Sequence, residues 1–133
     1  MSTGNITFET VREIGLALPD VEETTMYASP ALKVCGRLLA CVPVNKSVEP
    51  GSLAVALDPE HRSALLEEAP RTYYVTDHYA AHPIVLVRLS EIGREELAGL
   101  LYSAWRFVTA EAKRTARRPA GGRLNPSARG KPQ

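Results

Sequence analysis

The chain of 133 residues is 44% hydrophobic and 6% aromatic, which suits one domain with a mainly aliphatic core and is too short for two. Its net charge of +1 divides into −6 for residues 1–112 and +7 for residues 113–133, a segment without Asp or Glu. No apolar run approaches the roughly 20 residues of a membrane span, and residues 1–6 lack the features of a signal peptide. We therefore expect a cytoplasmic protein with no membrane partner.

The N-terminal part of the chain predicts a helix followed by a hairpin. Apolar side chains at helical spacing indicate an amphipathic helix over Thr7–Leu18. Two β-compatible runs, Ala31–Cys35 and Leu38–Val44, are joined by Gly36-Arg37 and predict a hairpin that turns at this dipeptide. With this turn the two cysteines would not face each other, so we expect reduced thiols and no disulfide.

The remainder of the domain predicts three strands and two helices. Asp58-Pro59 is a helix start, because Asp offers a capping oxygen and Pro fits the first helical position. A polar loop with two histidines is expected at Thr76–Pro83. The strands are expected at Leu53–Leu57, Thr72–Val75 and Ile84–Leu89, and the helices at Pro59–Ala69 and Arg94–Glu111.

The predicted element order is α-β-β-β-α-β-β-α, which indicates an α+β fold. Short connections between successive strands favour one antiparallel sheet over a parallel one, and we expect helices on one of its faces. Residues 1–112 would form the domain. Residues 113–133 contain few apolar side chains and are expected to be a basic, disordered tail.

The loop that contains Asp77, His78 and His82 is the most tempting place for chemistry, because Asp and His together can act as a general base. Adjacent side chains rarely point at a common centre, however, and the sequence has no nucleophile motif. A polar loop with structural roles is the simpler interpretation. We expect no catalytic residue, metal site or cofactor, and we keep a small-ligand protein or an enzyme that uses this loop as a lesser alternative.

Basic and aromatic residues form the other candidate site. The tail is either a solubilising segment or a contact for the phosphate backbone of nucleic acid. Basic residues of the predicted strands could share one sheet face with a tyrosine and stack bases. The candidate nucleic-acid-binding residues are Lys33, Arg37, Arg71, Tyr74, His78, Tyr79, Arg88, Lys113, Arg114, Arg117 and Arg118.

An ordered set of segments resembles a known family. The set, in chain order, is Leu18-Pro19-Asp20-Val21-Glu22-Glu23, Tyr27-Ala28-Ser29-Pro30-Ala31-Leu32-Lys33-Val34, Gly36-Arg37-Leu38-Leu39-Ala40, Leu57-Asp58-Pro59-Glu60, Tyr73-Tyr74-Val75-Thr76-Asp77-His78-Tyr79, Val85-Leu86-Val87-Arg88-Leu89, Glu95-Glu96-Leu97 and Ala104-Trp105-Arg106. Across residues 8–110 this is similar to the MmcQ/YjbR family of small bacterial proteins that are commonly described as DNA-binding. Many members carry His-Trp where this chain has His78-Tyr79.

The resemblance implies a fold similar to that of type III secretion chaperones and a DNA-binding or regulatory role without enzymatic activity. By analogy with those chaperones, the alternative is a protein-interaction module that binds another protein or itself. The resemblance supplies no catalytic residues, and it does not extend to the tail.

Overall fold

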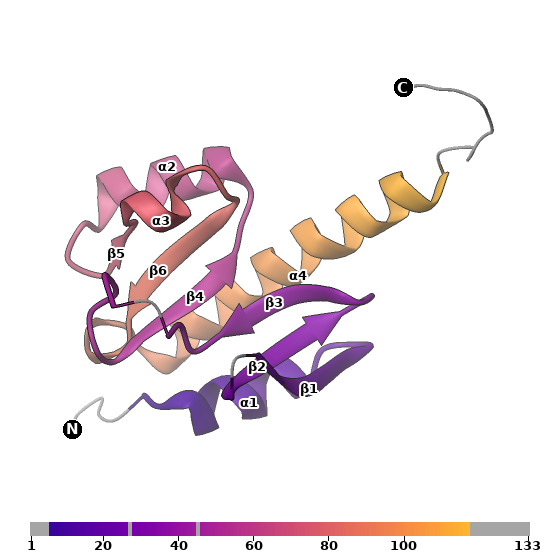
Figure 1. Ribbon diagram of the computed structural model, residues 1–133, viewed down its shortest axis with the longest axis horizontal. Coiled ribbons are helices and arrows are strands. Elements are labelled where there is room, and N and C mark those ends of the chain that lie inside the picture. Colours follow the sequence, from indigo (N-terminus) through magenta and orange to yellow (C-terminus); the bar gives the residue numbers. More distant parts are fainter. Residues whose placement is uncertain (1–5, 27, 45, 118–133) are drawn as a thin grey trace.

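A computed structural model describes residues 6–26, 28–44 and 46–117. Its strands form one antiparallel sheet in the order β1-β2-β3-β4-β6-β5, with helices packed against it (Figure 1). The α+β class is therefore confirmed. The elements are α1 (Phe8–Leu16), β1 (Val21–Met26), β2 (Ser29–Val34), β3 (Arg37–Cys41), β4 (Ser52–Ala56), α2 (Pro59–Glu68), β5 (Tyr73–Tyr74), α3 (Asp77–Ala80), β6 (Ile84–Arg88), the 3₁₀ turn η1 (Leu89–Glu91) and α4 (Arg94–Arg117).

Helices cover both faces of the sheet, and the expectation of one covered face is wrong. On one face, Gly15 of α1 approaches Leu32, and the Tyr73 hydroxyl donates a hydrogen bond of 2.9 Å to Glu96 of α4. On the other face, Ile84 lies beside α3. Every residue of β4 is buried. Because β4 and β6 are apolar on both faces, each face has to be shielded from water.

The core is mostly aliphatic, as the composition predicted. Tyr73 is the buried aromatic residue among the described core residues. The largest fully buried side chains come from β2, β3, β4, β6, α1 and α4, and include Leu32, Leu39, Leu53, Leu86, Leu97 and Leu101.

Two elements were missing from the prediction. β1 lies at the edge of the sheet, where it pairs with β2 from Val21↔Val34 to Met26↔Ser29, so the sheet has six strands and not five. Glu22 and Glu23 of β1 are exposed, so the strand carries little hydrophobic pattern. The segment predicted as a polar loop at 76–83 contains the short helix α3, Asp77–Ala80, which is too brief to show helical periodicity.

The β2–β3 hairpin turns one residue earlier than predicted. Val34 pairs with Arg37, so the turn consists of Cys35 and Gly36, whose φ angles are 55° and 74°. Two positive φ angles are the mark of a type I′ turn, whose twist matches that of the flanking strands. Both cysteines are free, as expected; Cys35 is exposed and Cys41 is buried.

The last helix is longer than predicted. α4 continues to Arg117, five residues into the segment expected to be disordered, and its end projects beyond the sheet (Figure 1). Ala, Lys and Arg are good helix formers, and cations in the last turn complement the helix dipole, as Glu95 and Glu96 do in the first turn. Residues 118–133 of the predicted tail lie outside the described residues.

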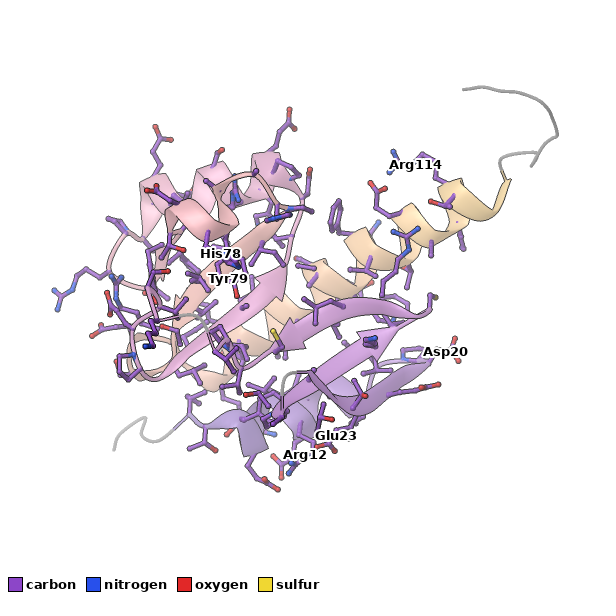
Figure 2. All side chains as sticks on the ribbon, viewed as in Figure 1. Arg12, Asp20, Glu23, His78, Tyr79 and Arg114 are labelled. Atoms are coloured by element: carbon purple, nitrogen blue, oxygen red, sulfur yellow. The ribbon has the colours of Figure 1, made fainter. Side chains whose placement is uncertain are left out.

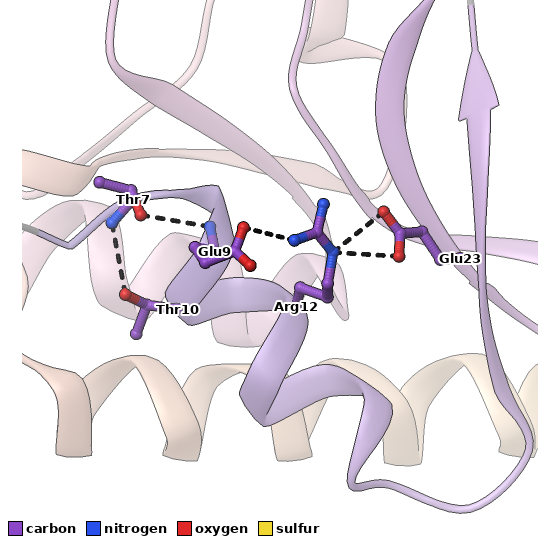
Figure 3. A network of polar contacts seen from close by, with 5 residues as sticks. All are labelled: Thr7, Glu9, Thr10, Arg12 and Glu23. Atoms are coloured by element: carbon purple, nitrogen blue, oxygen red, sulfur yellow. Dashed lines mark hydrogen bonds and ion pairs between the residues drawn. The ribbon is translucent and has the colours of Figure 1, made fainter.

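Helix α1 is fixed to the edge of the sheet by a small polar network (Figure 3). The Thr7 hydroxyl accepts a hydrogen bond of 3.2 Å from the backbone N–H of Glu9 and caps the helix. The Arg12 guanidinium bonds both carboxylate oxygens of Glu23 on β1 at 3.0 Å and also bonds Glu9. These contacts orient α1, which packs on β2 and α4.

Candidate functional site

A cavity of about 590 Å³ opens between β3 and the α3–β6 segment, and we call it the α3 cavity. Leu38 and Cys41 share the sheet face that Ile84 occupies, because Leu38 pairs with Lys33 and Cys41 with Ala31. The chain that leaves β3 supplies one wall of the cavity. The lining residues are Leu38, Cys41, Val42, Pro43 and Val44 on one side, and His78, Tyr79, His82, Pro83 and Ile84 on the other.

Arg62 of α2 holds the far side of the α3–β6 segment. Its Nη1 donates hydrogen bonds to the carbonyl oxygens of His82 at 2.8 Å and Ile84 at 3.0 Å, with a longer one of 3.4 Å to Tyr79. Its Nη2 donates to the carbonyl of Ala80 at 3.2 Å. One guanidinium therefore binds four carbonyl groups between Tyr79 and Ile84, and it fixes the wall of the cavity.

The structure brings together only part of the candidate catalytic group of Asp77, His78 and His82. His78 and His82 line the α3 cavity, and the His78 ring meets the Tyr79 ring edge-on at 4.7 Å between centroids. Asp77 does not line the cavity; it lies in the first turn of α3. The structure therefore brings the two imidazoles to one cavity without bringing the Asp77 carboxylate with them.

Cys41 is the potential nucleophile in this cavity, and its environment makes it a weak one. Burial raises the pKa of the Cys41 thiol above its ordinary value, which keeps the thiol protonated, and the thiolate is the reactive form. Within the described ranges, no three His, Cys, Asp or Glu side chains come together as metal ligands.

The basic residues of the candidate set fall into separate groups. Arg37 lies on the α4 side of the sheet, where its Nη2 donates a hydrogen bond of 2.9 Å to the Thr115 hydroxyl. This bond joins the β2–β3 hairpin to the last turn of α4, so that Arg37 lies at the same end of the molecule as Lys113 and Arg114. We call the exposed side chains of Arg37, Lys113 and Arg114 the basic end; Arg114 also pairs with Glu111.

A second group lies at the opposite end of the strands, where Arg88 is fully engaged. It forms an ion pair with Glu49 at 2.8 Å, donates to the carbonyls of Pro70 and Arg71, and lies 4.3 Å from the centroid of the Tyr74 ring. The Arg88 guanidinium lowers the pKa of Glu49. This arrangement joins three segments of the chain and leaves no free charge on Arg88.

The predicted residues thus do not form one patch. Lys33 belongs to the sheet face opposite Arg37, and Arg71 and Tyr74 lie with Arg88. His78 and Tyr79 lie on the body of the molecule, apart from Arg114 at the projecting end of α4 (Figure 2). The side chain of Arg117 and the whole of Arg118 lie outside what the structure describes.

Two residues were not predicted from the sequence: Arg62, which fixes the wall of the α3 cavity, and Thr115, which bonds Arg37 at the basic end. Arg62 precedes Leu65 by three residues and Leu66 by four, so it shares the inner face of α2 with both leucines. That spacing was a usable signal for a partly buried arginine. Thr115 carried no signal, because it lies in a segment that was expected to be disordered.

Comparison with known proteins places this chain among related sequences. Residues 16–107 match the model of the YjbR family. A stretch of 42 residues is 43% identical to an uncharacterized protein of Mycobacterium tuberculosis and to one of Mycobacterium bovis, covering 32% of this chain and 33% of each relative. The match thus spans about a third of the mycobacterial proteins.

A solved structure shares the fold. The crystal structure of protein DR2400 from Deinococcus radiodurans, which contains a DUF419 domain, superposes with a TM-score of 0.65 and 24% sequence identity. The superposition covers 83% of this chain and 88% of that one. In the part of the chain that the structure describes, no helix is both long and apolar enough to cross a bilayer.

Proposed function

This chain belongs to the YjbR family, as its resemblance implied, and we propose that it is a non-enzymatic protein that binds the phosphate backbone of DNA through its basic end. The observation that carries the proposal is the hydrogen bond between Arg37 and Thr115. It attaches the projecting end of α4 to the sheet, so that cations from two distant parts of the chain lie at the same end of the molecule.

The charge distribution supports this proposal. Residues 1–112 carry a net charge of −6, and residues 113–133 carry +7. An acidic body repels a polyanion, so the attractive contacts belong at the end where the basic residues are concentrated. Such contacts recognise phosphate and not base sequence. The proposed role is therefore DNA binding without strong sequence preference.

The absence of an enzymatic role is also part of the proposal. A Cys–His or Asp–His mechanism needs an activated nucleophile or an aligned acid–base pair. The raised pKa of Cys41 and the position of Asp77 outside the cavity both disfavour these mechanisms.

Neutralising the basic end tests the proposal. The double variant Lys113→Gln, Arg114→Gln should weaken binding to duplex DNA and reduce the slope of log affinity against log salt by about 1 for each cation removed, measured by fluorescence anisotropy. The matched control is Lys46→Gln, Arg71→Gln, which removes the same charge from two exposed side chains elsewhere. Equal losses in both double variants would mean that net charge, and not the basic end, determines binding.

A second candidate, a protein-interaction module, is favoured by one observation. Tyr102 is 49% exposed and stacks on Trp105 at 6.0 Å between centroids, while the Trp105 Nε1 donates to the carbonyl of Pro19 at 2.9 Å. Exposed aromatic side chains are common in protein interfaces. Self-association would be supported if the molecular mass measured by analytical ultracentrifugation rises with protein concentration. The Tyr102→Ala variant should then have the mass of the monomer at all concentrations.

A further inference from the structure

The α3 cavity has the size and lining of a small-molecule site. Its volume of about 590 Å³ lies within the range of roughly 300–1,000 Å³ that ligand pockets occupy. Leu38, Val42, Pro43, Val44 and Ile84 give it an apolar lining. Such a lining would take up an apolar ligand body by removing it from water.

The polar side chains on the α3 side can donate hydrogen bonds into the cavity. Four carbonyl oxygens of the segment from Tyr79 to Ile84 accept hydrogen bonds from Arg62, on the side of α2. The imidazoles of His78 and His82 line the cavity. Within the described ranges, no hydrogen bond engages either ring, and an imidazole can donate through its N–H. A ligand group with two acceptor oxygens can therefore bond both rings.

The charges of the lining residues indicate which kind of acceptor group the cavity can bind. The cavity lining contains no Asp, Glu, Lys or Arg. Cys41 is the other acidic group of the lining besides the tyrosine, and burial raises the pKa of its thiol, so that it stays neutral. A ligand with an anionic head group would thus find two imidazoles and no negatively charged side chain in the lining. A metal ion finds no set of three ligands here within the described ranges.

We propose that the α3 cavity binds a small amphipathic carboxylic acid, with its apolar body against Leu38 and Ile84 and its carboxylate held by His78 and His82. This site is separate from the basic end, and the proposal does not depend on DNA binding. Hydrogen bonds between donors and an ionised carboxylate are about twice as strong as neutral ones. The head therefore contributes selectivity, while the body contributes most of the buried apolar area.

Three ligands with the same chain and different heads test the proposal on the full-length protein: octanoate, octanol and octylamine. Isothermal titration calorimetry should show octanoate binding about tenfold more tightly than octanol, the difference expected for a charge-assisted hydrogen bond. Octylamine should bind more weakly than octanol. Octanol binding as tightly as octanoate, or no binding by any of the three, would overturn the proposal.

Substitutions at the imidazoles locate the head. His82→Ala should reduce the affinity for octanoate about tenfold and leave the affinity for octanol unchanged. His61→Ala is the matched control, because His61 lies on α2 and does not line the cavity. A similar loss of octanoate affinity in both variants would contradict the assignment.

A charge placed at the cavity rim gives a second test that does not depend on the histidines. Val44 lines the cavity and is 54% exposed, so a polar residue there leaves the core intact. Val44→Asp should weaken octanoate binding several-fold by repulsion, while the near-isosteric Val44→Asn should retain it. Equal affinity of the two variants for octanoate would show that no carboxylate head approaches this rim.

Discussion

At the scale of single residues, Arg62 connects the fold to the candidate cavity. Its guanidinium bonds carbonyls of Tyr79, Ala80, His82 and Ile84, which belong to the segment that carries both cavity histidines. A planar group with five donors can satisfy several carbonyls at once, and neither Lys nor an apolar residue can replace it. The position of the two imidazoles therefore depends on a residue that does not itself line the cavity.

Replacing Arg62 by Met should lower the free energy of unfolding by about 2 kcal/mol, because partly buried carbonyls lose their donors. Urea denaturation followed by circular dichroism measures this change. The control Arg71→Met removes an exposed arginine and should change stability by less than about 0.5 kcal/mol. If both variants were equally stable, Arg62 would not be holding the α3–β6 segment.

The two cysteines should react at very different rates. Cys35 is exposed in the hairpin turn. Cys41 is buried, which limits access of the reagent, and burial raises the pKa of its thiol, which disfavours the reactive thiolate. Mass spectrometry after treatment with iodoacetamide should show rapid modification of the Cys41→Ser variant and slow modification of Cys35→Ser. Unfolding in urea should make the two rates similar; fast labelling of native Cys35→Ser would contradict the burial of Cys41.

At the scale of elements, the sequence predicts those helices and strands that have a clear hydrophobic pattern. The helices with apolar periodicity and the buried strands β4 and β6 were found close to their bounds, except that α4 continues to Arg117 and not to Glu111. β1 was missed because it is stabilised by pairing with β2 and not by a hydrophobic pattern of its own. α3 was missed because four residues are too few to show helical periodicity. The hairpin turn was placed one residue late, because Gly36-Arg37 and Cys35-Gly36 both contain the glycine. The cavity itself unites β3 with the α3–β6 segment, a long-range contact that no local pattern reveals.

A matched pair of glycine substitutions tests the hairpin assignment. Gly36 has a φ of 74° with no atom near its missing side chain, so Gly36→Ala should cost about 1 kcal/mol of stability through the backbone alone. Gly99 lies within α4, also with open space around it, and Gly99→Ala should stabilise the protein by up to about 1 kcal/mol. Thermal or urea denaturation checks both; a neutral Gly36→Ala would argue against the type I′ turn.

At the scale of the whole molecule, α4 separates the charges. Its first turn carries Glu95 and Glu96 beside the acidic body, and its last turns carry Lys113 and Arg114 beyond the sheet. The sequence revealed the acidic body and the basic segment, but only the structure shows that a helix extends the domain into that segment and that Arg37 meets it there. The basic end is thus part of the folded domain and is continuous with the remaining basic residues of the chain.

The most direct test of the proposed DNA-binding function is the salt dependence of affinity for duplex DNA. Fluorescence anisotropy of the full-length protein with two unrelated duplexes should give similar affinities and a linear fall of log affinity with log salt. The slope should be at least about 2 in magnitude, because each neutralised phosphate contributes about 0.9. The basic end holds Arg37 and Lys113, and also Arg114, which is paired with Glu111. No binding at low salt, or an affinity that does not change with salt, would contradict the proposed function.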